Sequence, residues 1–348
     1  MSHPTVENNT PFGFEFLYLA DEEGQPLFSP IVKATYEIHT KKPMMLADEQ
    51  VPVNTGGDYW GDPDFSSYKY EPETAFIKPA TDVVLIGHAH AQKTGTTFVD
   101  VGVRVGPVQK VVRVVGDRLL VTRSGNVSVY GPKPFEKIPL VYERAFGGWD
   151  RSHPNPDKHK FEPRNPVGVG YGYPDGKTEE PIRLPNIEDP KRPWKRWGDR
   201  PPPAGFGFFS PHWQPRASFV GTYDKKWDET RKPLLPTDFD RRFFNAASPG
   251  LIAPGYLRGN EPVVIVNASP GGRISFNLPG VPPPWCAVEL RGGKEEVLQT
   301  QLDTVIINTD ENLVFLLWRA NMLVRNGPQD VLAIEIDTKP RATKTAEA

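Results

Sequence analysis

The chain of 348 residues contains a single cysteine, Cys286. One cysteine excludes an intramolecular disulfide framework and a zinc site built from several thiolates. Long apolar runs are also missing, because no segment approaches the roughly 18 consecutive apolar residues that a membrane-spanning helix needs. Residues 1–10 have neither the basic stretch nor the apolar stretch of a secretory signal. These absences predict a cytoplasmic protein.

An excess of charge of either sign is missing as well. The sequence has 41 Lys and Arg against 43 Asp and Glu, a formal net charge of −2. Binding to nucleic acid or to an anionic membrane needs concentrated positive charge. The most basic stretch, 191–200, places Lys and Arg beside Trp194 and Trp197, but acidic residues at 188, 189 and 199 offset them. We therefore expect neither nucleic acid nor a membrane as partner.

Proline and glycine, in contrast, are abundant, with 39 and 31 residues. Proline breaks helix interiors because it lacks a backbone N–H. A hydrophobic content of 38% and an aromatic content of 11% argue against disorder. The sequence therefore predicts a mainly β fold with little helix. We expect an antiparallel β-sandwich or barrel-like core with long, ordered Pro/Gly-rich loops.

Short segments of β-branched and aromatic residues, separated by turn residues, predict the strands. Phe12 to Tyr18 alternate with a period of two, turn residues occupy 21–26, and a β-branched run covers 31–38, so 12–38 is predicted to be a hairpin. Val99 to Val105 alternate in the same way and predict a strand with one buried face. The other predicted strands are 82–90, 111–115, 119–122, 127–130, 263–266, 274–278, 287–290, 297–307, 313–318 and 331–336.

The distribution of proline predicts the domain organisation. Residues 132–284 contain 27 of the 39 prolines. Within them, the region 146–260 has few windows that favour a regular element, but it is rich in aromatic anchors. We predict a single β-rich domain over 10–338 that includes this ordered loop region, with flexible tails at 1–9 and 339–348. A division into two domains near residue 145 is the alternative.

Two histidines form the strongest metal candidate. His88 and His90 are two residues apart on a predicted strand, so their side chains share one face. A zinc or copper site needs a third protein ligand, and the sequence offers none nearby. Two histidines satisfied by hydrogen bonds at a sheet edge are the favoured alternative, so no metal or other cofactor is predicted.

Two pairs of aspartates raise the question of catalysis. Asp62 and Asp64 form one pair, and Asp238 and Asp240 form the other. A carboxylate pair can act as acid and base in glycoside hydrolysis when its separation is right. Asp also stabilises turns by bonding its own backbone. With eight tryptophans, these pairs keep open a carbohydrate-active β protein, either a lectin-like module or a glycosidase.

Other sequence signatures of enzymes are weak or missing. The glycine-rich segments 168–172 and 205–207 do not join a clear strand to a helix, as a nucleotide-binding loop must. Neither a nucleophile-elbow motif nor a zinc-protease helix motif occurs. The lone Cys286 fits a small buried hydrophobe. We expect a protein that is not an enzyme.

Several short motifs, taken together, resemble those of one family. They lie at 59–63, 78–83, 87–91, 142–148, 165–168, 184–188, 203–207, 221–224 and 235–245. Over roughly residues 10–320 the sequence resembles an uncharacterised-domain family encoded within bacterial type VI secretion clusters. Members of that family are regarded as adaptors or chaperones, which help to load effectors carrying a PAAR tip domain onto the VgrG spike.

The resemblance implies a non-enzymatic, cytoplasmic role without a cofactor. The implied partner is a PAAR-containing or PAAR-associated effector, with VgrG as a second one. Stiff aromatic loops suit such a role, because proline-restrained loops lose less entropy on docking. The candidate partner-binding or loop-fixing residues are Glu143, Arg144, Trp149, Trp194, Trp197, Asp238, Asp240, Arg241 and Arg242. Internal stabilisation of loops is an equal alternative for each of them.

Overall fold

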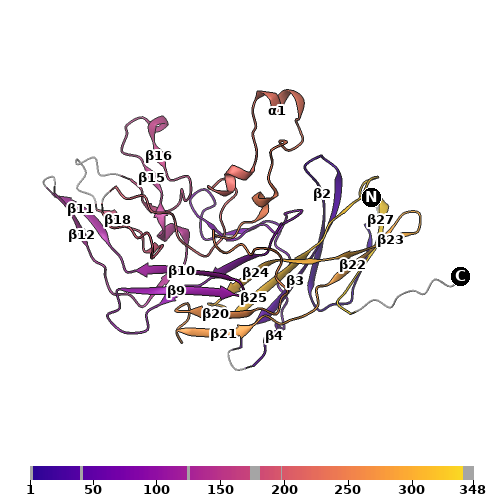
Figure 1. The fold of residues 1–348 in the computed structure, drawn as a ribbon, viewed down its shortest axis with the longest axis horizontal. Helices are drawn as coiled ribbons and strands as arrows, with labels where there is room; N and C mark the ends of the chain where they lie inside the picture. The colour runs from indigo at the N-terminus through magenta and orange to yellow at the C-terminus, as the bar shows by residue number, and fades with distance from the viewer. Residues whose placement is uncertain (1–2, 40–41, 124–125, 173–180, 197, 340–348) are drawn as a thin grey trace.

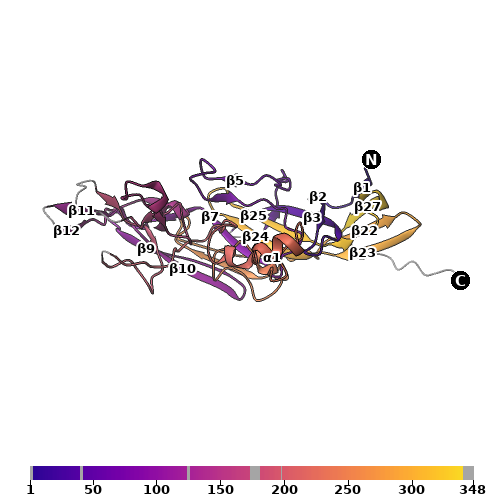
Figure 2. The same cartoon turned by 90° about the horizontal axis from the view of Figure 1, so that it is seen from above.

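The computed structural model describes residues 3–39, 42–123, 126–172, 181–196 and 198–339. The molecule is elongated and flattened (Figures 1 and 2). Strands β11 (Leu119–Arg123) and β12 (Asn126–Tyr130) lie at one end, and β22 (Trp285–Leu290), β23 (Lys294–Gln299) and β27 (Val331–Asp337) lie at the other. The fold is mainly β, as predicted, and α1 (Lys225–Thr230) is the only α-helix of the described chain.

The largest sheet has seven strands, and it contains the predicted hairpin. Its strands are β2 (Gly13–Ala20), β3 (Pro26–Glu37), β25 (Leu313–Arg319), β24 (Gln301–Asn308) and β7 (Asp82–Ile86), with the short β4 (Met45–Leu46) and β26 (Met322–Leu323) also on β3. The register of β2 and β3 runs from Gly13 opposite Lys33 to Ala20 opposite Pro26. Only β24 and β7 pair in parallel, so the sheet is largely antiparallel.

A five-stranded antiparallel sheet forms the middle of the molecule. Its strands, in order, are β19 (Ile187–Glu188), β10 (Val108–Val115), β9 (Phe98–Val105), β20 (Pro262–Val266) and β21 (Arg273–Asn277). The odd-numbered valines from Val99 to Val105 are buried, whereas Arg104 is exposed. The predicted strand with one buried face is therefore confirmed.

The third large sheet contains a strand from the N-terminal residues, which were predicted to be a flexible tail. Its order is β1 (Thr5–Asn8), β27, β22 and β23. Residues 1–9 were predicted to form a flexible tail, but β1 pairs in parallel with β27 from Thr5 opposite Ala333 to Asn8 opposite Ile336. All four residues of β1 are exposed. The backbone ladder holds this edge strand, and its side chains give no hydrophobic pattern from which a strand could be predicted.

The predicted strand 297–307 is in fact two strands of different sheets. Strand β23 ends at Gln299 and β24 begins at Gln301. Thr300 between them is buried, and its hydroxyl donates to the carbonyl of Pro284 at 2.5 Å. A similar break at Gly87 divides the predicted strand 82–90 into β7 and β8 (His88–His90). The predicted segments 82–90 and 297–307 favour strand on both sides of these breaks, so the sequence did not mark the two places where the chain changes sheet.

The remaining elements are short. A three-stranded sheet has the order β12, β11 and β18 (Ile182–Arg183). The two-stranded pairs are β5 (Asp58–Tyr59) with β6 (Tyr68–Tyr70), β8 with β13 (Lys137–Pro139), β14 (Phe146–Gly147) with β17 (Val169–Gly170), and β15 (Trp149–Asp150) with β16 (Lys160–Phe161). Single 3-10 turns cover Tyr142–Arg144, Pro156–Lys158, Arg216–Phe219, Arg241–Phe244 and Pro328–Asp330.

One hydrophobic cluster joins the three large sheets. It contains Phe28 and Leu316 of the seven-stranded sheet, Val103 and Val112 of the five-stranded sheet, and Ile334 of the four-stranded sheet. A separate small cluster lies beside the three-stranded sheet and consists of Leu120, Phe146, Leu184 and Trp194. The sheets are open in the described chain, so the sandwich-like alternative fits the core better than the barrel-like one.

Aromatic residues hold the described parts of the region 146–260. Phe206, Phe208, Phe209 and Trp213 are buried in the main cluster. The ring centroids of Phe209 and Trp213 lie 5.8 Å apart, and both rings contact Tyr142 edge to face. Within the described residues, no helix is long and apolar enough to cross a membrane.

Candidate partner-binding surface

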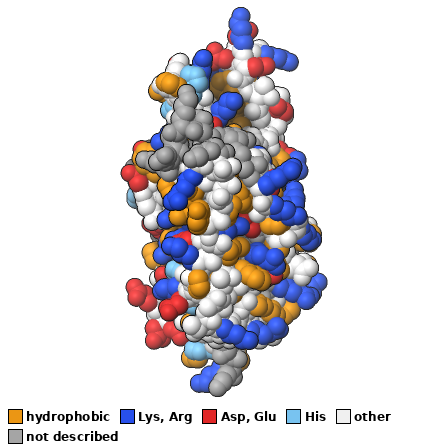
Figure 3. Space-filling model, turned by 90° about the vertical axis from the view of Figure 1, so that its left-hand side faces the viewer, with side chains coloured by type: hydrophobic (Ala, Val, Ile, Leu, Met, Phe, Trp, Pro, Cys, Tyr) orange, Lys and Arg blue, Asp and Glu red, His pale blue; other side chains and the backbone are white. Residues whose placement is uncertain are grey.

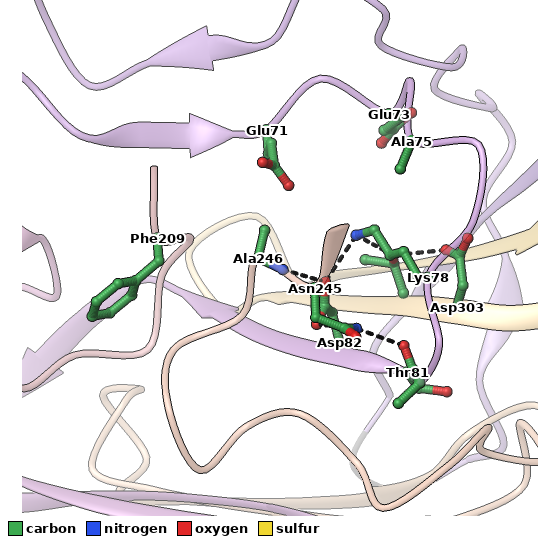
Figure 4. A network of polar contacts seen from close by, with 12 residues as sticks. Glu71, Glu73, Ala75, Lys78, Thr81, Asp82, Phe209, Asn245, Ala246 and Asp303 are labelled. Atoms are coloured by element: carbon green, nitrogen blue, oxygen red, sulfur yellow. Dashed lines mark hydrogen bonds and ion pairs between the residues drawn. The ribbon is translucent and has the colours of Figure 1, made fainter. Parts of the chain in front are cut away.

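Buried charges join the segment 71–82 and the loops around 209–216 and 243–246 to the seven-stranded sheet. Figure 4 shows part of this network, which lies where 71–82 crosses the seven-stranded sheet. Lys78 Nζ donates to Asp82 Oδ2 at 2.8 Å and to the hydroxyl of Thr304 at 3.1 Å. Asp82 is fully buried and also accepts hydrogen bonds from Asn245 Nδ2 and from the backbone N–H of Ala246, each at 2.9 Å. Asp82 thus connects β7 to the loop that follows residue 244.

Three further buried ion pairs surround this one. Lys33 Nζ lies 2.7 Å from Glu73 Oε1, and Arg319 Nε lies 2.7 Å from Asp303 Oδ2. In the third pair, Arg216 contacts Glu71 and also donates to the carbonyls of Phe209 and Phe243, each at 2.7 Å. Every one of these four cations is matched by a carboxylate. The network is therefore electrically balanced and acts as a scaffold.

Two pKa values in the network show this balance. Burial disfavours the charged form of Lys78, but the carboxylates of Asp82, Asp303 and Glu71 together hold its pKa above the ordinary value. Burial raises the pKa of Glu71, against the opposing effect of Arg216 and Lys78. A small cleft of about 330 Å³ beside Lys78 and Arg319 adjoins the network. Of its charged lining residues, Lys78 is paired with Asp82, and Arg319 is paired with Asp303.

The predicted residues Glu143 and Arg144 have loop-fixing contacts. Glu143 Oε1 accepts from the backbone N–H of Ser67 at 2.6 Å, and its Oε2 accepts from the hydroxyl of Ser67 at 3.0 Å. Arg144 Nη1 donates to Asn186 Oδ1 at 3.1 Å and lies 3.4 Å from Asp117 Oδ1. Both side chains connect segments that are distant in sequence.

The predicted residues of 238–242 likewise fix their own loop. Asp238 accepts from the backbone N–H and the hydroxyl of Thr222, at 3.0 and 2.7 Å. Asp240 caps the turn Arg241–Phe244 by accepting from the N–H of Arg242 at 2.9 Å. The guanidinium of Arg242 lies 4.4 Å from the ring centroid of Phe219.

Arg241 contacts a residue outside its own loop. Its Nη2 donates to Glu22 Oε2 at 3.0 Å, which links this loop to the turn of the β2–β3 hairpin. The hydrogen bond with Arg241 is the main cause that lowers the pKa of Glu22. As with Glu143 and Arg144, these contacts are the loop stabilisation that stood as the alternative to partner binding.

The three predicted tryptophans have different positions. Trp194 is buried in the small hydrophobic cluster, and Trp197 lies outside the described residues. Trp149 is 43% exposed. Its ring centroid lies 4.6 Å from that of Phe161, and the guanidinium of Arg151 lies 5.4 Å from it. Of the predicted residues that the structure describes, Trp149 is therefore the large apolar side chain that a partner can reach.

More exposed apolar residues lie at the same end of the molecule. All five residues of β12 are exposed, and Val127, Val129 and Tyr130 are 45, 46 and 52% exposed. Trp149 lines a cleft of about 550 Å³ with Ile182 and Arg183 of β18, which belongs to the same sheet as β12. We define Val127, Val129, Trp149, Arg151 and Phe161 as the end surface. Figure 3 looks onto this end of the molecule, where hydrophobic and basic side chains are interspersed.

The histidine pair has ordinary hydrogen-bonding surroundings. His88 and His90 share one face of β8, as predicted, with the buried Ala89 between them. His88 Nδ1 lies 2.8 Å from Asp310 Oδ2. Burial, followed by the neighbouring His88, lowers the pKa of His90. Among the described residues, no group of three or more His, Cys, Asp or Glu side chains is placed to hold a metal ion.

The other aspartate pair also stabilises a turn. Asp62 Oδ1 accepts from the backbone N–H of Asp64 at 3.0 Å, and the carbonyl of Asp62 accepts from the hydroxyl of Ser66 at 2.7 Å. Together with the contacts of Asp238 and Asp240, this arrangement matches the turn-forming interpretation of both pairs.

Sequence reasoning missed most of the end surface. Phe161 and the β12 residues were not among the predicted site residues, although 127–130 was predicted as a strand. A signal was present, because this segment has three large apolar residues and neither the charge nor the proline that commonly protects an edge strand. The buried ion pairs gave no such signal, since Lys78 and Asp82 become neighbours only through the loop that joins them.

Comparison with known families places the chain in one of them. Residues 23–319 match the family model described as an uncharacterized protein conserved in bacteria (DUF2169). The chain belongs to this family. No curated protein and no solved structure matches the chain.

Proposed function

We propose that this DUF2169 protein is a non-enzymatic adaptor or chaperone of a bacterial type VI secretion system. In this proposal it binds a PAAR-containing or PAAR-associated effector in the cytoplasm and assists its loading onto the VgrG spike. The motif resemblance supplies the secretion system and the effector class. The exposed Trp149, whose ring contacts that of Phe161 and lies beside Arg151, is the structural observation that carries the binding role.

The end surface has the composition of a protein-binding site. Tryptophan and arginine are among the residue types most often found at binding hot spots. An aromatic pair whose rings already contact each other loses little side-chain freedom on binding, so more of the contact energy remains as affinity. The contacts of Glu143 with Ser67 and of Arg144 with Asn186 hold the segment that precedes Trp149 in place before a partner arrives.

A pull-down with the effector encoded beside this gene tests the proposal. The full-length chain is expected to retain the effector at low and moderate salt. Trp149→Ala is expected to weaken binding at least about tenfold, as for a hot-spot aromatic. Tyr223→Ala is the matched control, because Tyr223 is 49% exposed and lies just before α1, away from the end surface.

The possible results test the adaptor function and the end surface separately. Failure of the wild-type chain to retain the effector at either salt concentration contradicts the adaptor function. Retention by the wild type and by Trp149→Ala with equal affinity keeps the adaptor but removes the end surface as the interface. Thermal melting of both variants checks that a loss of binding does not arise from unfolding.

Carbohydrate binding is the second candidate, and the same tryptophan favours it. An exposed aromatic pair beside a cleft of about 550 Å³ is also suited to stacking a sugar ring. A glycan array with the purified chain tests the lectin-like form, and glycan binding that Trp149→Ala abolishes would support it. The glycosidase form needs turnover that Asp238→Asn abolishes, and Asp238 is engaged by Thr222.

A further inference from the structure

Strand β10 has an open edge in the middle of the molecule. It pairs with β9 along all eight of its residues, but with β19 only at Arg113 and Val114. Val105 and Val108 close the two-residue β9–β10 turn, so alternate residues of β10 bond to β9 and the others face away. The backbone N–H and C=O of Gln109 and Val111 therefore point outward. Among the described residues, no hydrogen bond uses these groups.

The sequence after β19 leaves this edge uncovered. Strand β19 ends at Glu188, and Pro190 cannot continue the ladder because it lacks an N–H. Asp189 turns the chain away: its Oδ1 accepts from the N–H of Lys191, and its carbonyl accepts from the N–H of Arg192, each at 2.9 Å. An incoming strand could thus continue along β10 in line with β19.

A groove of about 490 Å³ runs beside the open edge. Val111, which is 52% exposed, lines it together with Val112 and Phe209. Its prolines are Pro190, Pro202, Pro203, Pro215 and Pro249. Proline walls are stiff and apolar, and they have no backbone donor to compete with the edge of β10. The groove therefore combines unpaired strand groups with a preformed apolar lining.

The charged residues of the groove are mostly basic. Lys110, Lys191, Arg164 and Arg192 line it, against Asp189 alone. Arg164 is engaged by Glu162 at 2.6 Å, but the side chain of Arg192 is 69% exposed, and its contact with Asp189 is long, at 3.4 Å. Lys191 is exposed and forms no ion pair within the described chain. An occupant with acidic side chains complements this lining.

We propose that the groove binds an extended, acidic segment of a protein partner, which adds to β10 as a strand at Gln109–Val111. Main-chain hydrogen bonds to Val111 supply affinity, and the contacts of alternate side chains with the prolines and with Lys191 and Arg192 supply selectivity. The proposal rests on the proposed function for the identity of the partner, because the effector is the expected source of the segment. The recognition chemistry itself is read from the groove.

Selection from a phage-displayed library of random 12-residue peptides on the full-length chain tests this site. Selected peptides are expected to be rich in Asp and Glu and in β-branched residues. Val111→Pro removes the outward N–H and is tolerated in an edge strand. It is expected to weaken peptide binding at least about tenfold, or about 1.4 kcal/mol. Val111→Thr keeps the N–H and should bind like the wild type.

Charge reversal gives a second measurement. Lys191→Glu should weaken the same peptides and reduce the salt dependence of their binding, whereas Lys225→Glu on α1, where the side chain is 89% exposed, should not. Equal binding to the wild type and to Val111→Pro, or selection of no binding peptide, overturns the proposal. A wild-type dimer in light scattering that Val111→Pro dissociates also overturns it, because the occupant is then a second copy. Peptide binding without effector binding leaves this site standing and contradicts the adaptor function.

Discussion

At the scale of single residues, the structure depends on charges that are buried together. Asp82 accepts three hydrogen bonds, from Lys78, Asn245 and Ala246, and Lys78 donates a further one to Thr304. A buried ion pair adds little net stability compared with an apolar pair, but removal of one partner leaves an uncompensated charge. The loops are therefore sensitive to the loss of either member of a pair.

Lys78→Met is expected to destabilise the protein by about 3–5 kcal/mol, because it leaves the carboxylate of Asp82 buried without its cation. Urea unfolding measures this loss. Lys232→Met is the matched control, since Lys232 and Asp228 have the same spacing but are 59 and 58% exposed, and its removal should cost less than about 0.5 kcal/mol. Similar losses for both variants would contradict the role given to the buried network.

Lys110 provides a prediction on pH dependence. Burial lowers the pKa of Lys110 to about 8, while its Nζ donates to Ser248 Oγ at 2.6 Å and to the carbonyl of Pro249 at 2.9 Å. Between pH 8 and about 10.4 the unfolded chain binds more protons at this residue than the folded chain. The contribution of Lys110 to stability should therefore rise with pH over this window.

Urea unfolding at pH 8 and pH 10 tests whether the contribution of Lys110 to stability rises with pH. The stability difference between wild type and Lys110→Met should change with pH in favour of the wild type as pH rises. The exposed Lys225→Met should show no such change relative to the wild type. A flat difference for Lys110→Met would show that its ammonium group is not destabilised by burial.

At the scale of elements, the loop region is organised by backbone segments that approach one another closely. Strands β14 and β17 pair in parallel, and Gly148 follows β14 with a φ of +91°. A Cβ on Gly148 would lie 2.3 Å from the carbonyl oxygen of Gly168. Because Trp149 comes next in the chain, this crossing also places the aromatic pair of the end surface.

Gly148→Ala is expected to lower stability by more than about 2 kcal/mol, since left-handed strain of about 1–2 kcal/mol adds to a backbone clash. Thermal unfolding measures the loss. Gly250→Ala separates the two effects, because Gly250 has a similar φ of +88° but nothing within 4 Å of the added Cβ. Equal losses for the two variants would mean that the close approach of β14 and β17 costs nothing extra.

At the scale of the whole molecule, the shared hydrophobic cluster predicts how the chain unfolds. Residues from Phe12 to Ile336 contribute to it, on both sides of residue 145. A single core favours cooperative unfolding. Calorimetry of the full chain is therefore expected to show one transition, with equal calorimetric and van't Hoff enthalpies. Two resolved transitions would instead support a division of the chain near residue 145.

Much of the local structure could be predicted from the sequence. The period-two alternation of 12–18 and 99–105 identified β2 and β9, because alternate side chains of a strand meet opposite environments. The abundance of proline excluded long helices. The same local rules failed for Thr5–Asn8, whose exposed side chains give no pattern, and at Thr300, where the segment 297–307, predicted as one strand, passes from one sheet to another.

The candidate site shows the same contrast between what the sequence determines and what only the tertiary structure decides. The sequence by itself determined that Trp149 belongs to a region rich in proline, glycine and aromatic residues, and that the chain is mainly β with little helix. Only the tertiary structure decided that Trp194 is core whereas Trp149 is exposed, that Asp238 and Asp240 fix a loop, and that β10 keeps an open edge. The physical reason is that exposure and pairing depend on which distant segments pack together, and local sequence does not encode those contacts residue by residue.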